Sequence, residues 1–167
     1  MYMINKKFEF SYAHRVHNQA LTGNKECSCR RIHGHNGVIT VELGLDSLTR
    51  DMVLDYNELN FFKKFIDTFI DHRLIIDEND PMFSLLIPSP YHVVDSRFGF
   101  SKICKQGEYE SDAEKELFDS IVLISCCPTS ENFCKMIYDA LKNEVACVFR
   151  VSWSETGKTD AYYYEKN

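Results

Sequence analysis

No apolar run in the sequence approaches the roughly 20 residues that a membrane span needs. The opening segment, MYMINKKFEF, also lacks the apolar core of a signal peptide, so we expect a cytoplasmic protein with no membrane partner. Basic residues are in deficit, with 19 lysines and arginines against 25 aspartates and glutamates. A net charge of −6 argues against nucleic acid as a partner, since non-specific binding to it needs a basic face.

The sequence also lacks internal repeats, low-complexity segments and a disulfide framework. Its seven cysteines are an odd number, and in a cytosolic chain they are expected to be reduced thiols. With 167 residues, of which 44% are apolar, the chain has the size and composition of a single domain with a real core, over residues 1–167.

Hydrophobic periodicity predicts an α+β fold in which helices cover one face of an antiparallel sheet. Leu59, Phe62, Ile66 and Phe69 recur at helical spacing. PTSEN at 128–132 begins a second helix, with Thr129 or Ser130 as its N-cap. The predicted helices and strands are a helix over 57–70, the helix from 128–132, and strands over 6–16, 37–45, 146–155 and 161–165, the last two joined by a turn at 157–160.

The stretch from 73 to 127 is the least regular part of the sequence. Residues 91–94 and 121–124 could pair with each other as strands. Between them, the acidic segment 106–116 is expected to be solvated.

Four of the six histidines and two of the seven cysteines lie within the first 35 residues, among them His14, His33, His35 and Cys29. His33 and His35 are two apart, so in a strand they share a face, and Gly34 lets the backbone come close. A third imidazole, from His14 on a neighbouring strand, would complete a three-histidine site. Such a site leaves one zinc position open, as catalytic zinc requires.

A structural zinc site made of Cys27, Cys29 and two histidines is the alternative. Structural sites usually pair two short ligand clusters, and the sequence has no Cys-x-x-Cys to supply a second one. In the catalytic interpretation, Cys29 lies near the metal and arginines, so its thiol should be partly ionised and able to act as a base or proton shuttle. Cys27 lies at similar range, and the other cysteines are expected to be inert.

Two further groups have both a catalytic and an ordinary interpretation. Asp71 could orient the His72 ring and hold its conjugate acid, or the two could be a charge pair at a helix end. Glu155 could bind an amino-pyrimidine by accepting two parallel N–H···O hydrogen bonds, or could be a surface residue at a strand end. Arg15, Lys25, Arg30 and Arg31 lie beside the histidines and could supply a positive cluster for an anionic substrate.

The segments FSYAHRV, CRRIHGHN, DMVLDYNELN, IDHRLI, PTSEN and SET occur in this order over residues 8–156. Together they resemble the 6-pyruvoyl-tetrahydropterin synthase family, and within it the 6-carboxy-5,6,7,8-tetrahydropterin synthases of queuosine and 7-deazaguanine biosynthesis. The resemblance covers nearly the whole chain except about 80–127, which is therefore an insertion. It implies the tunnelling fold (T-fold), with four antiparallel strands, two helices on one face, and a homo-oligomer, typically a hexamer, with active sites between subunits.

The resemblance also implies roles for individual residues. Zinc would be held by the histidines at positions 14, 33 and 35, and the catalytic residues would be Cys29, Asp71 and His72. The substrate-binding residues would be Glu155, which anchors the pterin, together with Thr129, Ser130 and Glu131. The implied enzyme is a zinc-dependent lyase that converts 7,8-dihydroneopterin triphosphate to 6-carboxytetrahydropterin, acetaldehyde and triphosphate. Arg15, Arg30 and Arg31 are our candidates for binding the triphosphate.

Two other subfamilies and a non-catalytic member remain alternatives. The pyruvoyl-forming enzymes of biopterin synthesis tend to have a longer gap between the cysteine and HGH than the three residues found here. They also tend to have a Thr-Thr-Glu form in place of PTSE. A third subfamily has a glutamate in place of the cysteine. Cys29 at the usual spacing argues against it, although Glu26 is nearby. A non-catalytic pterin- or metal-binding protein of the same fold would have its site covered by the insertion.

Overall fold

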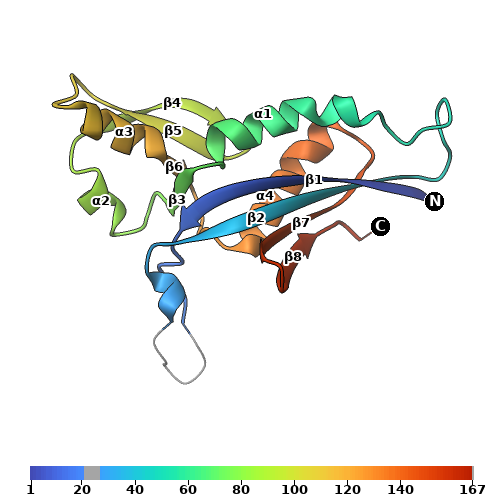
Figure 1. Cartoon of the computed structure of the whole chain (residues 1–167), viewed down its shortest axis with the longest axis horizontal. Coiled ribbons are helices and arrows are strands. Elements are labelled where there is room, and N and C mark those ends of the chain that lie inside the picture. The colour runs from blue at the N-terminus through green and yellow to red at the C-terminus, as the bar shows by residue number, and fades with distance from the viewer. Residues whose placement is uncertain (21–26, 167) are drawn as a thin grey trace. The chain divides into compact units, whose positions relative to one another are not determined.

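A computed structural model describes residues 1–20 and 27–166 (Figure 1). The helices and strands, in chain order, are β1 (Tyr2–His14), η1 (Ser28–Arg30), β2 (His33–Leu45), η2 (Tyr56–Leu59), α1 (Asn60–Phe69), β3 (Arg73–Asp77), α2 (Phe83–Leu86), β4 (Tyr91–Arg97), β5 (Phe100–Lys105), α3 (Asp112–Ser120), β6 (Ile121–Ile124), α4 (Ser130–Glu144), β7 (Val148–Thr156) and β8 (Thr159–Tyr163). None of the helices in the described ranges is both long and apolar enough to span a membrane.

The prediction of an α+β fold is confirmed, but the predicted four-stranded antiparallel sheet is wrong. Eight strands form one mixed sheet in the order β4-β5-β6-β3-β1-β2-β7-β8. β3 runs parallel to β1 and also to β6, whereas β2, β7 and β8 follow one another antiparallel. The additional strands lie within residues 73–124, where the sequence indicated strands at 91–94 and 121–124 but gave no signal for β3 or β5.

The chain divides into two compact units. The first contains residues 1–10, 36–68 and 130–167, and the second contains residues 11–35 and 69–129. The division falls within β1, β2 and α1.

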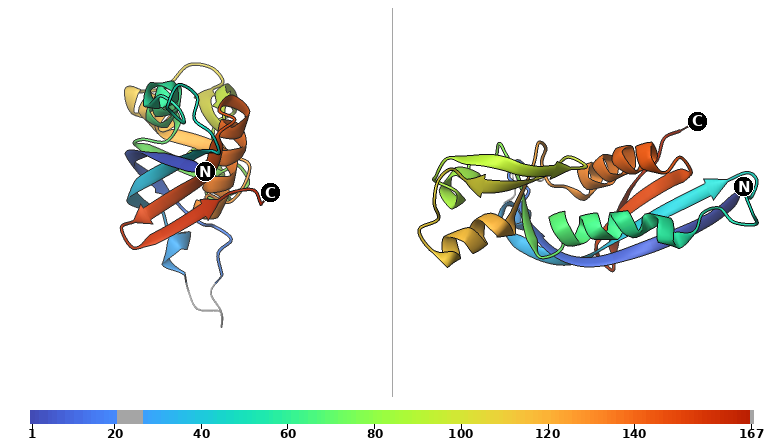
Figure 2. Two further views of the ribbon diagram at one scale, coloured as in Figure 1. Left: turned by 90° about the vertical axis from the view of Figure 1, so that its right-hand side faces the viewer. Right: turned by 90° about the horizontal axis from the view of Figure 1, so that it is seen from above.

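The core of the first unit lies between its strands and the helices α1 and α4. The Phe62 ring of α1 meets the Phe8 ring of β1 edge-on at 5.1 Å between centroids. Phe133 of α4 stacks on Trp153 of β7 at 4.3 Å, and Trp153 also contacts Phe10 at 4.8 Å. Because Phe8 and Phe10 are two residues apart on one strand, both helices cover the same face, as predicted. Figure 2 shows α4 running along β7 and β8.

Both predicted helices of this unit are present. The helix expected over 57–70 begins as the 3-10 turn η2, where the Asp55 carboxylate accepts a hydrogen bond from the Asn57 backbone, and continues as α1. The second helix, α4, begins at Ser130 and buries Phe133, Ile137 and Leu141 completely.

The second unit has a buried apolar core of its own. Ile76, Phe83, Ile103, Phe118 and Leu123 belong to one buried cluster. This cluster spans β3, α2, β5, α3 and β6, so residues 73–124 are a packed structure and not a loose loop.

One expectation for residues 80–127 needs correction. Residues 91–94 and 121–124 are both in strands, but they do not pair with each other, because β5 lies between β4 and β6.

The acidic segment 106–116 is exposed to solvent as expected, with only Tyr109 and Glu114 half-buried. It leads into the helix α3, where the Ser111 hydroxyl accepts a hydrogen bond from the Glu114 backbone and Phe118, beyond the segment, is buried.

Candidate metal centre and active site

The three histidines predicted to bind zinc lie together in the second unit. His14 ends β1 and is only 1% exposed, and His33 and His35 open β2 with both rings half-buried. One ring nitrogen from each histidine falls within 4.8 Å of the other two. A Cβ at Gly34 would lie 3.2 Å from the Tyr12 carbonyl oxygen, so a side chain there would crowd the neighbouring strand.

Backbone carbonyls orient two of the imidazoles. The Nδ1 of His14 lies 2.7 Å from the carbonyl oxygen of Pro128, and the Nδ1 of His33 lies 2.8 Å from that of Arg31. A carbonyl oxygen can only accept, so each Nδ1 donates a hydrogen, and in the neutral ring each Nε2 carries a lone pair. Hydrogen bonds of this kind fix the tautomer of metal-binding histidines.

The two Nε2 atoms of His14 and His33 are 3.1 Å apart. In neutral rings two lone pairs at this distance repel each other, and a cation between them would remove the repulsion. Two nitrogens at the usual Zn–N distance in tetrahedral geometry would be about 3.3 Å apart. The donor set therefore suits zinc. Among the described residues, this cluster contains no cysteine, which argues against the structural site built on Cys27 and Cys29.

Cys29 sits in the short 3-10 turn η1 and is half-buried. Its carbonyl oxygen accepts a hydrogen bond of 2.8 Å from the backbone N–H of Val16, two residues beyond His14. Burial raises the pKa of the thiols of Cys126, Cys127, Cys134 and Cys147, that of Cys134 to about 12. These four thiols are therefore weak nucleophiles at neutral pH, as expected of inert cysteines.

Asp71 and His72 form a fixed pair just after α1. The Oδ1 of Asp71 lies 3.0 Å from the Nδ1 of His72 and also accepts a hydrogen bond of 2.8 Å from the Ser11 backbone N–H. The His72 backbone N–H in turn donates to the Ser11 carbonyl oxygen at 2.6 Å. The His72 side chain is 79% exposed, and its backbone has a positive φ of 58°. The ring is thus oriented by a carboxylate while remaining open to solvent.

The residues expected to bind the pterin fall in both units. Thr129 belongs to the unit with the histidines, whereas Ser130, Glu131 and Glu155 belong to the other unit and are described within it. Ser130 and Glu131 occupy the first turn of α4. Glu155 is half-buried at an irregularity of the β7–β8 pairing between Ser154 and Thr156. Such bulges redirect a side chain and are frequent next to active sites.

The structure does not support Arg15 as a ligand for triphosphate. Its Nε lies 3.1 Å from the Oδ2 of Asp80, with the two side chains only 11% and 0% exposed. Arg30 and Arg31 are exposed at the end of η1 and stay candidates. Lys25 and Glu26 lie outside the described residues.

A sequence profile of the 6-pyruvoyl tetrahydropterin synthase family matches residues 3–166. The chain belongs to this family. A relative from Aquifex aeolicus, called 6-carboxy-5,6,7,8-tetrahydropterin synthase, is 33% identical over 98% of this chain and 98% of its own length. A relative from Rickettsia typhi has the same name. It is 29% identical over a shorter stretch, which covers 48% of this chain and 55% of the relative.

Two solved structures share the fold of this chain. An uncharacterized protein from Wolinella succinogenes has a TM-score of 0.90 and 36% identity, over 99% of this chain and 98% of that one. The 6-pyruvoyl tetrahydropterin synthase of Caenorhabditis elegans has a TM-score of 0.59 and 23% identity, over 99% and 96% of the two chains, and shows the shared fold. The prediction of a single domain over residues 1–167, with an insertion at about 80–127, stays a prediction.

Sequence reasoning missed the groups that orient the candidate ligands in this family member. The carbonyls of Pro128 and Arg31 and the backbone N–H of Ser11 are main-chain atoms, so no residue type signals them. Pro128 lies 114 positions from His14, and only the folded chain brings the two together.

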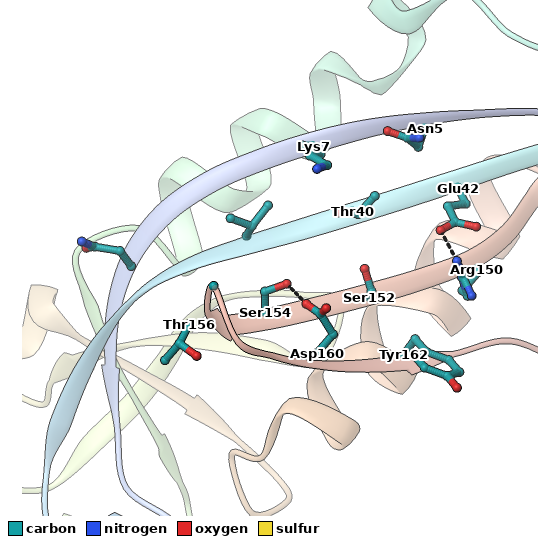
Figure 3. Close-up of a pocket in the computed structure, with 13 residues that line it drawn as sticks. Asn5, Lys7, Thr40, Glu42, Arg150, Ser152, Ser154, Thr156, Asp160 and Tyr162 are labelled. Atoms are coloured by element: carbon teal, nitrogen blue, oxygen red, sulfur yellow. Dashed lines mark hydrogen bonds and ion pairs between the residues drawn. The ribbon is translucent and has the colours of Figure 1, made fainter.

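The first unit also has a groove of about 560 Å³ on the sheet face opposite α1 and α4 (Figure 3). Its side chains include Lys7 and Thr40, and a Glu42–Arg150 ion pair of 2.5 Å crosses from β2 to β7. The Arg150 guanidinium also lies 5.3 Å from the centre of the Tyr162 ring. These charges are paired within the sheet, so the groove offers less distinctive chemistry than the histidine cluster.

Proposed function

We propose that this chain is a zinc-dependent 6-carboxy-5,6,7,8-tetrahydropterin synthase. It would convert 7,8-dihydroneopterin triphosphate to 6-carboxytetrahydropterin, acetaldehyde and triphosphate, in queuosine and 7-deazaguanine biosynthesis. The relative from Aquifex aeolicus, alike over almost its whole length, supports this substrate class. The observation that carries the zinc site of this proposal is the 3.1 Å approach of the Nε2 atoms of His14 and His33.

His14, His33 and His35 would hold the zinc ion. When bound, zinc would polarise an oxygen of the substrate side chain and make a neighbouring carbon-bound proton more acidic. The Pro128 and Arg31 carbonyls would keep the rings of His14 and His33 in the metal-binding tautomer throughout the reaction.

Proton transfer would be carried out by this chain's own side chains. Cys29, as thiolate, would take the carbon-bound proton, which suits a half-buried thiol whose backbone is fixed to the end of β1. His72, oriented by Asp71, would give or accept the complementary proton.

Pterin binding would depend on Glu155, Thr129, Ser130 and Glu131. A carboxylate can accept two parallel N–H bonds from an amino-pyrimidine edge, which fixes the plane of the ring. Correct placement of reacting groups can lower a barrier by about 7–11 kcal/mol in favourable cases.

The enzyme would work as a homo-oligomer, a hexamer by the family pattern, with active sites between subunits. β8 stands at one end of the strand order and carries the 59% exposed Tyr162. An edge strand of this kind can pair with another chain. Light scattering coupled to size-exclusion chromatography tests this, and a stable, fully active monomer would contradict it.

Product analysis tests the activity. The purified protein is incubated with 7,8-dihydroneopterin triphosphate, and mass spectrometry identifies the pterin while a dehydrogenase-coupled assay detects acetaldehyde. The 6-carboxy product with acetaldehyde supports the proposal. A 6-pyruvoyl product without acetaldehyde would favour the biopterin-type reaction, and an unchanged substrate would favour a non-catalytic pterin-binding member.

A further inference from the structure

A buried ion pair lies directly beside the first zinc ligand. Arg15 follows His14 in the chain, and its Nε is 3.1 Å from the Oδ2 of Asp80. Asp80 is fully shielded from solvent at its side chain, and Arg15 is nearly so. Two charges at this depth are costly to desolvate and stay buried only when they hold each other in place.

Three hydrogen bonds hold Asp80 in the turn between β3 and α2. Its backbone N–H donates to the Asp77 carbonyl oxygen at 3.0 Å, and its Oδ1 accepts a hydrogen bond of 2.8 Å from the Met82 backbone. Its own carbonyl oxygen accepts from the N–H of Phe83, whose ring belongs to the core of the insertion. One carboxylate oxygen of Asp80, Oδ1, therefore stabilises the turn, and the other, Oδ2, faces Arg15.

On the other side, Arg15 adjoins His14, the proposed metal ligand. His14 is aligned with Ile75 in the parallel β1–β3 ladder and bonded through Nδ1 to Pro128. β1 ends at His14, and the next residue, Arg15, forms the ion pair with Asp80. His17, two residues further on, lies with its Nδ1 3.8 Å from the Oδ2 of Asp80.

We propose that Asp80 is a positioning residue for the three-histidine centre, holding the end of β1 through Arg15 so that the His14 ring meets those of His33 and His35. The predicted insertion would then help to position the metal ligands. This inference rests on the proposed function, since it takes the three-histidine centre to be the zinc site of the enzyme.

The test measures zinc affinity by competition with a chromogenic chelator, in the wild type and in Asp80→Asn. The variant removes the charge that holds Arg15, and we expect zinc to bind about tenfold more weakly, as for changes behind other metal ligands. We also expect kcat to fall more than KM rises. Asp80→Glu, which keeps the charge, should recover part of the affinity. Glu108→Gln removes an exposed charge elsewhere in the insertion and should leave zinc affinity unchanged.

A double variant separates positioning from stability. Arg15→Met with Asp80→Leu replaces the ion pair by apolar side chains, a change that often preserves or raises stability. If this variant melts at the wild-type temperature yet binds zinc more weakly, the pair positions the ligand. Wild-type zinc affinity in a folded Asp80→Asn or in the double variant would overturn the inference. A wild type that binds zinc but makes no tetrahydropterin would instead overturn the proposed function alone.

Discussion

Removal of one imidazole should abolish the stabilisation of the fold by zinc. His33→Ala deletes one of the two Nε2 atoms that lie 3.1 Å apart and leaves two histidines, too few for a three-nitrogen site. A ligand that binds only the folded state at about 100 times its Kd stabilises that state by about 2.7 kcal/mol. In a chain of 167 residues this corresponds to a rise in Tm of about 5–11 °C.

The assay is thermal unfolding of the chelated protein with and without added zinc, together with metal content by elemental mass spectrometry. The wild type should show the rise in Tm and His33→Ala should not. His92→Ala, which removes an exposed histidine of β4, is the matched control and should respond like the wild type. An unchanged metal content and an unchanged Tm response in His33→Ala would refute the ligand assignment.

The same experiment distinguishes a catalytic from a structural metal. The apolar cluster around Ile76 contains none of the three candidate ligands. The chelated wild type should therefore keep its far-ultraviolet circular dichroism. A protein that unfolds on chelation would indicate a structural zinc site.

Three further predictions concern single side chains. Cys29→Ala should keep its zinc and lose turnover by about two orders of magnitude or more, whereas Cys147→Ala should remain active; a fully active Cys29→Ala would remove this thiol from the mechanism. Glu155→Gln should weaken pterin binding, measured by fluorescence titration, at an unchanged Tm, and normal binding would place the anchor elsewhere. Phe133→Ala, which deletes a fully buried ring stacked on Trp153, should lower the free energy of unfolding in urea by about 3–5 kcal/mol, and a loss below 1 kcal/mol would contradict the packing described here.

The sequence by itself determined the elements whose signals are local. Alternation around Ile39 and Val41 and the helical spacing around Phe62 predicted β2 and α1, because burial of one face imposes its period on the chain. His-x-His on one strand likewise predicted a shared face for His33 and His35.

Only the tertiary structure decided what depends on distant partners. Parallel pairing of β3 with β1 and β6, and the place of β5 between β4 and β6, join segments far apart in the chain and leave no periodic signal in either. The Pro128 carbonyl that orients His14 is a main-chain atom 114 positions away. The charge of Arg15 suggested a substrate ligand, and only the fold showed that Asp80 holds it. Local periodicity reports which face of a segment is buried, whereas the identity of the group against that face depends on how the whole chain folds.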